Sequence, residues 1–338
     1  MKKIFMFAAM ASVALASCVK NEPVANVEQG DLITFNAPVV APATKGQAAY
    51  TLGDFNVYAY SNPTTGYTGG GSVYIKDQKV SLTDGVWSAG KYYWPKNAYL
   101  NFVAYAPNSA LTNGLSVVTE AQTKTDAGNL VLSYTVPENS QQDILYSEWA
   151  LDQTAASNVT TSVGTAYTGV DIAFHHALAQ VNFTIKGGPI AINDSRVKIQ
   201  KVDLVGLNNV GTLTVAYTDD AEWTGLSGNA TYNIWNTTAV LTENGTSAKF
   251  ILLPQTLTAN TKLVVTYQLP SDDTNGYTVY TVDVPLHTAK SGEDTIGAWE
   301  MEKNYIYTVI FDVDAIELAP VVKEDWTNVT MNNYEGLL

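Results

Sequence analysis

The stretches Val181-Asn182-Phe183-Thr184-Ile185 and Tyr305-Ile306-Tyr307-Thr308-Val309 decide the fold of this chain. Successive side chains of a strand point to opposite faces, so a period of two residues indicates strands rather than helices. Similar runs, bounded by turn residues, recur at 33–35, 55–58, 100–102 and 263–265. Between such runs lie turn pairs that suit hairpins with positive φ, namely Asp84-Gly85, Asn244-Gly245 and Asn275-Gly276. Helical periodicity is nearly absent, and we predict an all-β protein.

The length of 338 residues suggests two or three domains. One shift in composition marks a boundary: residues 150–169 are mostly Ala, Ser, Thr, Gly and Asn, with little to bury. Such a stretch is typical of a long surface loop or an interdomain linker. It divides the chain into parts of similar length, each large enough for one β-sandwich. We therefore predict two tandem domains, at residues 31–165 and 166–338.

The composition excludes several classes of protein. The net charge is −14, from 18 Lys and Arg against 32 Asp and Glu, which offers no basic surface for nucleic acid. Charged residues make up only 15% of the chain and hydrophobic residues 46%, so the chain is neither disordered nor supercharged. Cys18 is the only cysteine, which rules out an intramolecular disulfide.

The N-terminus has the pattern of an export signal at residues 1–17. Lys2 and Lys3 precede an apolar and small-residue run at residues 4–16, which spans only about 20 Å of a ~30 Å hydrocarbon core. Leu15-Ala16-Ser17-Cys18 resembles the lipobox of bacterial lipoproteins, in which Cys18 becomes the acylated first residue. The alternative is a free or buried thiol. We predict a lipid anchor at Cys18.

The residues after the cysteine indicate where such a lipoprotein goes. Val19 stands where an Asp would retain it, which points to the outer membrane. Lys20-Asn21-Glu22 resembles the charged surface-export signals of Bacteroidetes lipoproteins, and a solvated tether is the alternative reading. We predict a tether at residues 18–30 and a location on the outside of the outer membrane.

No pattern for catalysis or metal binding stands out. The histidines are His175, His176 and His287, and the first two are adjacent, so on a strand they face opposite ways and cannot share a metal. Ser72 and Ser227 lack the second glycine of a nucleophile elbow. The stretch Asp272-Asp273-Thr274-Asn275-Gly276 resembles part of an EF-hand-type calcium loop, but it lacks the closing Glu, and a hairpin turn fits better. We predict a non-enzyme without catalytic, cofactor or metal residues, although a carboxylate pair for glycoside hydrolysis stays open.

Aromatic residues are concentrated in one short stretch: Trp87, Tyr92, Tyr93, Trp94, Tyr99, Phe102 and Tyr105. Such rings could stack on sugars, which keeps a glycan-binding surface lipoprotein as the alternative function. However, apolar side chains point to both faces at residues 99–105, as in a core strand that is covered on both sides. Burial of Trp87, Trp94 and Tyr105 would favour the structural role.

Several segments together resemble one family. They are Tyr92-Tyr93-Trp94-Pro95, the run from Leu100 to Pro107, Asp143-Ile144-Leu145-Tyr146, the run from Phe174 to Val181, Tyr305-Ile306-Tyr307 and Asp325-Trp326. With the lipoprotein start, this set resembles the fimbrillin (Mfa-like, type V pilin) proteins of Bacteroidales. The resemblance implies two tandem transthyretin-like β-sandwich domains and a fimbrial subunit or accessory adhesin. Its partners would be other fimbrial subunits, and its receptor is unknown.

The same resemblance implies assembly by β-strand addition. In such subunits a protease cuts after an Arg behind the first strand, and a strand of a neighbour fills the groove. Here the first strand would be residues 32–35, and the matching position is Lys45, followed by Gly46. The only Arg, Arg196, lies in the second predicted domain, so the chain is either cut at Lys45 by another protease or left uncut as an anchor or tip subunit. The donor strand would lie within residues 326–338, where Val329 and Met331 face one way, unless this is an ordinary last strand with a frayed tail.

Overall fold

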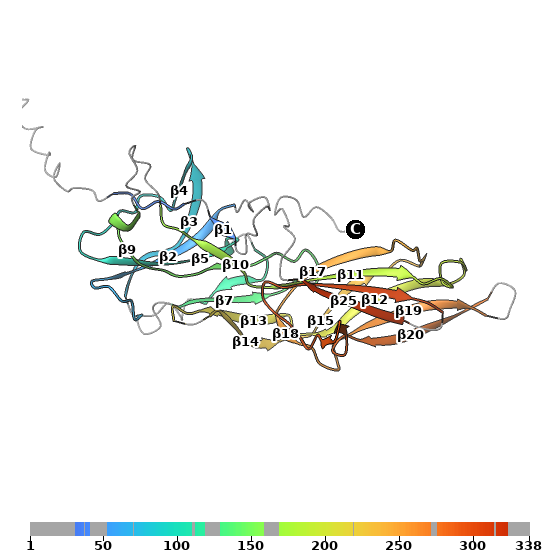
Figure 1. The fold of residues 1–338 in the computed structure, drawn as a ribbon. Coiled ribbons are helices and arrows are strands. Elements are labelled where there is room, and N and C mark those ends of the chain that lie inside the picture. The colour runs from blue at the N-terminus through green and yellow to red at the C-terminus, as the bar shows by residue number, and fades with distance from the viewer. Residues whose placement is uncertain are drawn as a thin grey trace, which may run out of the picture.

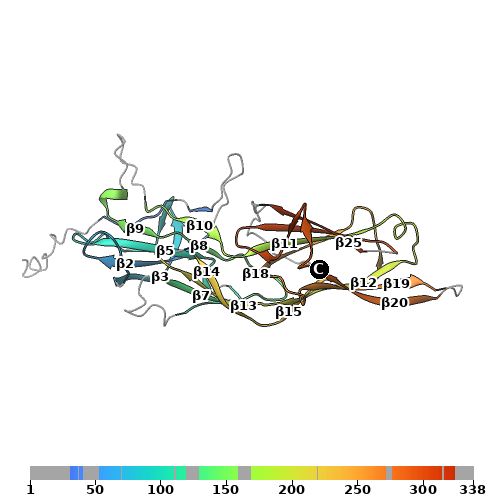
Figure 2. The same ribbon diagram turned by 60° about the horizontal axis from the view of Figure 1, so that its bottom comes forward.

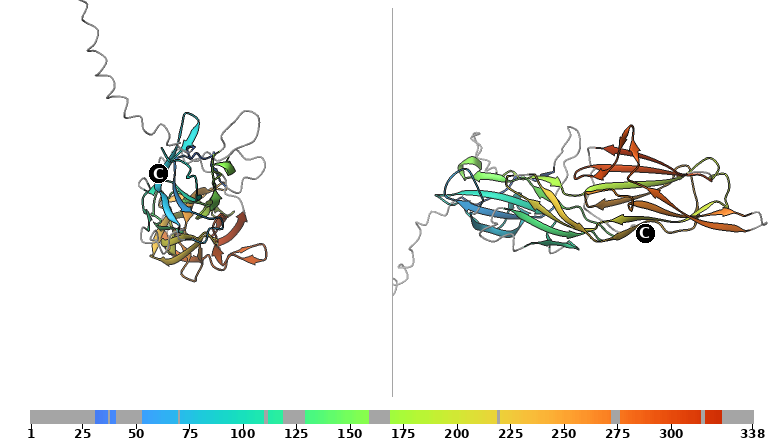
Figure 3. Two further views of the ribbon diagram at one scale, coloured as in Figure 1. Left: turned by 90° about the vertical axis from the view of Figure 1, so that its left-hand side faces the viewer. Right: turned by 90° about the horizontal axis from the view of Figure 1, so that it is seen from below.

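The computed structural model describes residues 31–36, 38–40, 53–69, 71–109, 112–118, 129–158, 169–218, 220–271, 276–313 and 316–323. The predicted signal peptide and tether, with Cys18, lie outside these ranges, as do Lys45, Gly46, Val329, Met331 and most of the stretch 272–276. The described chain is built from strands, with short 3₁₀ turns such as η4 (Ala156–Asn158), which confirms the predicted all-β class. No helix among these residues is long and apolar enough to cross a membrane. The molecule is elongated, with sheets layered at each end (Figures 1 and 3).

The largest sheet lies at the end of the molecule that holds the N-terminal strands (Figure 1). Its strand order is β1 (Val39–Val40), β10 (Ala173–His176), β8 (Leu145–Ser147), β5 (Tyr99–Ala106), β2 (Phe55–Asn62), β3 (Ser72–Thr83) and β4 (Val86–Ser88), with β9 (Ala150–Gln153) beside β5. The central strands β2 and β5 are buried on both faces, as predicted for residues 99–105. The hairpin between β3 and β4 turns at Asp84 and Gly85, whose φ values of 51° and 81° confirm the predicted turn.

Two layers cover this sheet. On one face, Tyr58 and Val103 pack against Leu132 and Leu213 of a four-stranded sheet. That sheet has the order β14 (Glu222–Ser227), β13 (Val210–Val215), β7 (Leu130–Thr135) and β6 (Leu115–Val117). On the other face, residues 33 and 35 belong to a second apolar cluster with side chains of β2 and β5, among them Phe102. The N-terminal residues thus supply part of a third layer.

The other end of the molecule is formed by two further sheets (Figure 2). One has the order β17 (Thr246–Leu252), β11 (Ala179–Gly187), β24 (Asn304–Phe311) and β25 (Ile316–Lys323). The other has the order β15 (Ala230–Trp235), β12 (Lys198–Leu207), β19 (Lys262–Pro270) and β20 (Tyr277–Pro285), with β16 (Ala239–Val240) beside β12. Short pairs complete it, β18 (Gln255–Thr256) with β23 (Ala298–Trp299) and β21 (Lys290–Ser291) with β22 (Asp294–Thr295).

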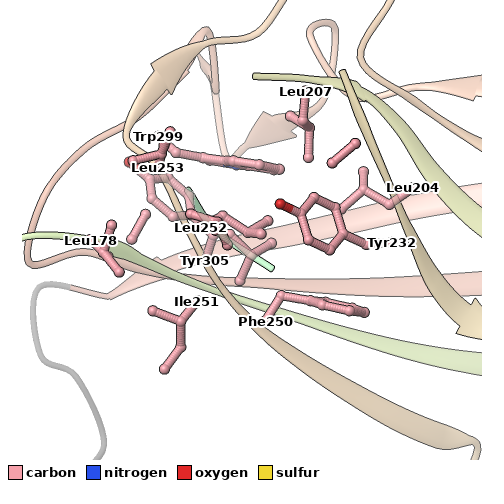
Figure 4. Packing of buried hydrophobic residues seen from close by; sticks show 14 of the residues in the cluster. Leu178, Leu204, Leu207, Tyr232, Phe250, Ile251, Leu252, Leu253, Trp299 and Tyr305 are labelled. Carbon is pink, nitrogen blue, oxygen red and sulfur yellow. The ribbon is translucent and has the colours of Figure 1, made fainter. Parts of the chain in front are cut away.

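The two stretches that open the sequence analysis become β11 and β24, which pair in parallel. Phe183 lies opposite Tyr307, and their rings stack with centroids 5.2 Å apart. Their odd-numbered side chains are buried, as the alternation predicts. Around them, large side chains of both sheets fill the core, including Tyr232 and Phe250 with ring centroids 5.8 Å apart (Figure 4). The alternation therefore identified the central strands of this core.

One expectation about the middle of the chain needs correction, and a second stays a prediction. The stretch 150–169 is not all loop, because its first four residues form β9, which pairs with β5. The domain division at residues 165 and 166 stays a prediction, and strands pair across it: β10 pairs with β8, and β13 with β7. Buried residues of both ends also belong to one contiguous apolar cluster. Composition taken over the whole stretch misses β9, because the many Ala, Ser, Thr, Gly and Asn residues that follow outweigh its four residues, Ala-Leu-Asp-Gln.

Candidate functional site: the N-terminal segment and its groove

Residues 31–36 and 38–40, here called the N-terminal segment, lie against the largest sheet, of which Val39 and Val40 are an edge strand. The apolar surface that Ile33 and Phe35 cover is here called the groove. Ile33 is 1% exposed and Phe35 4% exposed, which is the burial of core residues at the very start of the described chain. Ile33 and Phe35 are two residues apart, with Thr34 between them, so both point to the same side in an extended chain. The groove is therefore filled by side chains that the protein's own N-terminus provides.

Phe35 is the main apolar anchor of the segment. Its ring centroid lies 5.8 Å from that of Phe55 and 5.8 Å from that of Phe102, nearly perpendicular to both. Trp94 makes a third edge-to-face contact in this cluster, with its centroid 5.8 Å from that of Phe102. Edge-to-face pairs are favourable because the positive ring edge meets the negative face of the other ring. The floor of the groove is thus aromatic and matches an aromatic side chain.

Backbone hydrogen bonds hold the segment on two sides. On one side, the Ile33 N–H donates to the Tyr92 carbonyl at 2.8 Å and the Phe35 N–H to the Trp87 carbonyl at 2.9 Å. On the other side, the Val170 N–H donates to the Thr34 carbonyl at 2.8 Å. These contacts are isolated bridges rather than a ladder, so the first strand predicted at residues 32–35 is not a regular one. The segment is therefore held mainly by the burial of its side chains, with few backbone hydrogen bonds.

A glycine lets the chain approach the segment closely. A Cβ atom at Gly169 would lie 2.4 Å from backbone atoms of Phe35, well inside van der Waals contact. The Gly169 N–H donates to Asn36 Oδ1 at 3.0 Å, and Asn36 Nδ2 donates to Asp171 Oδ1 at 2.5 Å. Asn36 therefore fixes the register of the segment against residues 169–171. Sequence reasoning missed these residues, because Gly169 stood at the end of the supposed linker.

The segment ends beside the predicted cleavage position. Val39 and Val40 form β1, which pairs in parallel with Ala173 and Phe174 of β10. Val40 and Gly53 are the described residues that flank the predicted cut, and Lys45 and Gly46 fall between them in the sequence. A cut there would leave the segment attached to the rest of the protein by noncovalent contacts alone.

The aromatic stretch belongs to the core instead of an open platform. Trp94 is 5% exposed, Tyr105 is fully buried, and Trp87 is half-buried. Tyr105 donates a hydrogen bond of 2.7 Å from its hydroxyl to Asp77 Oδ1, and burial raises its pKa. This burial favours the structural role over sugar stacking.

The two adjacent histidines point in opposite directions, as expected for a strand. His175 Nδ1 lies 2.5 Å from Glu302 Oε1 and its Nε2 lies 3.1 Å from Glu148 Oε1. His176 Nδ1 lies 2.6 Å from Asp143 Oδ2. The hydrogen bond with Glu302 raises the pKa of His175 above its usual range, although partial burial opposes this.

These pairs join β10 to the residues on either side of β8 and to the turn before β24. Among the described residues, no group of three or more His, Cys, Asp or Glu side chains is arranged to hold a metal ion. The histidine pairs thus serve to tie elements together.

Comparison with known proteins places this architecture. The sequence matches the family described as fimbrillin-like over residues 43–326. A candidate cell adhesion protein of Bacteroides uniformis has a similar structure, with a TM-score of 0.52, 17% identity and coverage of 88% of this chain and 99% of that one. A fimbrial protein of Bacteroides vulgatus has a TM-score of 0.53, 15% identity and coverage of 81% and 93%. No curated protein matches the sequence.

The family match spans well over half of the chain, and the resemblance noted from the sequence is thereby confirmed. The likeness to the two solved structures extends over nearly their whole length and concerns the fold. The chain is a member of the fimbrillin-like family.

Proposed function

We propose that this protein is a lipidated fimbrial subunit or accessory adhesin of the cell surface, and that it assembles by β-strand addition. The observation that carries the proposal is the N-terminal segment, in which Ile33 and Phe35 are buried in a groove of their own sheet. Membership in a family of fimbrial and adhesion proteins supports the same role. In this scheme, the segment occupies the place that a strand of a neighbouring subunit later takes.

The groove has the two properties that strand exchange needs. Its floor is apolar, with Phe55 and Phe102 beneath Phe35, so leaving it empty would expose a large aromatic surface. Its walls offer backbone partners, since the Trp87 and Tyr92 carbonyls accept hydrogen bonds from the segment. Backbone bonds of this kind can be made by any extended chain, while the pockets select side chains at alternate positions.

The C-terminal residues fit this groove by pattern. Val329 and Met331 are two residues apart, like Ile33 and Phe35, so in an extended chain both would point to the same side. In a neighbouring subunit they would take the positions of the two anchors of the segment. Cleavage at Lys45 would release the segment, and Gly46 would become the new N-terminus.

The lipid anchor at Cys18 belongs to the same proposal. A protein cut at Lys45 loses the residues that carry the lipid, whereas an uncut protein stays in the outer membrane through its acyl chains. An uncut subunit would therefore be an anchor or an accessory adhesin. The cut form would be a building block of the fimbrium.

Mass spectrometry of the protein isolated from the cell surface tests the proposal. A mature N-terminus at Gly46 supports strand addition, and an acylated N-terminal Cys18 supports the anchored form. Lys45→Gln should abolish the first product, while the exposed control Lys91→Gln should leave it unchanged. An unmodified N-terminus at any other residue contradicts both forms.

Deletion of residues 330–338 tests the donor strand. We expect fibres to disappear while the thermal unfolding of the monomer stays the same, because the described core ends at residue 323. Fibres of unchanged length would exclude Met331 and the other deleted residues as the donor strand.

A further inference from the structure

β20 forms an edge that stands open at the end of the molecule far from the N-terminal segment (Figures 1 and 2). Among the described residues, it pairs only with β19, in an antiparallel ladder from Lys262 opposite Pro285 to Pro270 opposite Tyr277. Tyr277 is 57% exposed, Val279 46% and Tyr280 45%. A long apolar edge strand is a template for another strand unless a charge, a proline or a cover protects it.

The hydrogen bonds at the two ends of β20 show which of its backbone groups face outward. The Leu286 N–H donates to the Thr261 carbonyl and the Ser271 N–H to the Gly276 carbonyl, each at 3.0 Å. In an antiparallel ladder, alternate residues bond the same neighbour, so even-numbered residues of β20 bond β19. The odd-numbered residues therefore present their backbone groups to solvent, namely Tyr277, Val279, Thr281 and Asp283.

Pro285 agrees with this assignment. A proline has no N–H and is tolerated in a sheet only where no ladder bond is needed, as on the outer side of an edge strand. Pro285 is odd-numbered and lies at the end of β20. Its missing N–H thus limits outward pairing to the residues before it.

These outward groups fit a second copy of β20 in one antiparallel register. With Tyr280 on the two-fold axis, Tyr277 lies opposite Asp283 of the second copy, and Val279 lies opposite Thr281. This register uses every outward N–H and leaves Pro285 outside. It also sets Tyr280 opposite its own counterpart as a non-hydrogen-bonded pair, in which side chains are close. Tyr280 already stacks on Tyr267 at 5.6 Å, so the ring stack would continue across the axis.

Charge and shape also permit this pairing in an acidic protein. Asp283 is the only charged residue of β20, and Lys262 Nζ lies 2.5 Å from its Oδ2. The two Asp283 residues would lie about 20 Å apart along the ladder, beyond the ~8–10 Å screening length. On the inner face, a pocket of about 300 Å³ opens between the β20 edge and Ile316, lined also by Tyr267 and Phe311. Side chains of the added strand on that face would cover it.

We propose that two copies of this protein associate through their β20 edges, in the antiparallel register centred on Tyr280. The association forms a continuous sheet across both molecules. It does not depend on cleavage at Lys45, on the lipid or on the N-terminal groove, and it supplies a contact at the opposite end of the subunit. On a surface where many copies are anchored, such a contact joins neighbours side by side.

Cysteine cross-linking of the full chain in a Cys18→Ala background tests the register. Tyr280→Cys places the two sulfurs within disulfide reach, because residues opposite each other in a non-hydrogen-bonded pair have Cα atoms ~4.5 Å apart. In the control Val282→Cys the two positions lie ~13 Å apart, beyond that reach. We expect the covalent dimer to form at least about 10-fold faster with Tyr280→Cys than with Val282→Cys. Equal rates, or fastest cross-linking at another residue of β20, overturn the proposal.

Sedimentation equilibrium of the full chain measures the association itself. Val279→Pro removes an outward N–H without breaking a bond to β19, and we expect about 10-fold or greater weakening of the dimer with an unchanged Tm. The matched variant Val279→Thr keeps the N–H and should still dimerise. Repeating both in the Lys45→Gln background excludes strand addition in the N-terminal groove as the source of the dimer. A wild-type protein that stays monomeric up to millimolar concentration overturns the proposal.

Discussion

The N-terminal groove and the β20 edge are two places where a sheet can accept a further extended chain, and they differ in whether the protein fills them itself. In the groove, the protein's own residues fill the site, with Phe35 4% exposed over an aromatic floor. On the outer side of β20 the described residues supply no neighbouring strand, and Tyr280 is 45% exposed. Residues 31–36 of the segment make only isolated bridges but bury Ile33 and Phe35, whereas β20 belongs to a full ladder with β19 and keeps Tyr277 and Tyr280 exposed. The comparison teaches that the burial of side chains and the number of backbone bonds do not go together.

The largest difference between the two regions should appear when an aromatic ring is removed from each. Phe35→Ala leaves a cavity above Phe55 and Phe102, and we expect the free energy of unfolding to fall by about 3–4 kcal/mol. Tyr280→Ala removes a ring that is largely in water, and the monomer should lose less than about 1 kcal/mol. Urea denaturation at a concentration that keeps the protein monomeric measures both. Equal losses would contradict the view that only the groove is a closed site.

A smaller effect is expected from closing the gap above the segment. The methyl group added by Gly169→Ala would lie 2.4 Å from the Phe35 backbone, so the segment must shift. We expect the free energy of unfolding to fall by about 1–3 kcal/mol. The control is Gly297→Ala, whose methyl group would meet no atom within 4 Å. Thermal unfolding and the rate of trypsin cleavage after Lys45 check this prediction. A faster cut in Gly169→Ala alone would show that the segment has been loosened.

His175 links the two ends of the molecule. Its strand, β10, pairs with β1, and its side chain bonds Glu302 in the turn before β24. Its pKa is raised in the folded protein, so its charged form stabilises the fold. This contribution is complete below the pKa of the unfolded chain, ~6.5, and is lost as the pH rises through the raised value.

The variant His175→Gln tests that contribution. We expect it to lower the free energy of unfolding by only about 1 kcal/mol at pH 6. The effect is small because Glu148 is largely exposed and water screens its charge. At pH 9 the difference between variant and wild type should be smaller. Urea denaturation at both pH values measures it, and a loss that grows with pH would assign the stabilisation to the neutral imidazole instead.

The smallest effect concerns the outer face of β20. Tyr277→Ser changes a side chain that is 57% exposed, and we expect the stability of the monomer to change by less than about 0.5 kcal/mol. Far-ultraviolet circular dichroism and thermal unfolding check that the sheet is intact. A large loss would mean that Tyr277 is covered in solution by another part of the chain.

Much of the fold could be predicted from alternation, because the pattern reports which side chains face a core. Phe183, Tyr305 and Tyr307 are buried as the pattern requires, and the run at 99–105 is covered on both sides. The pattern fails where a segment is buried without a ladder. Residues 32–35 look like an ordinary strand in the sequence, but they form only isolated bridges.

The candidate site was accessible from the sequence only in part. Resemblance to fimbrillins drew attention to residues 32–35 and to Lys45, whereas nothing in the sequence indicated Gly169, Asn36 or Asp171 as contacts of the segment. Gly169 and Asp171 are more than 130 residues from Asn36 in the chain, and their proximity to it depends on how β10 is placed. The residues at 150–153, Ala-Leu-Asp-Gln, also gave no sign that they would pair with β5.

The sequence by itself determined the all-β class, the buried face of each central strand and the family, because alternation and motif order are local properties of the chain. Tertiary structure alone decided which strands are neighbours, and with that which edge is filled and which is open. Strand pairing is nonlocal: the same alternating strand can serve at the centre or at an edge, and only its neighbours in space distinguish the two. That is why Phe35 became a core residue while Tyr280, in an equally apolar strand, faces solvent.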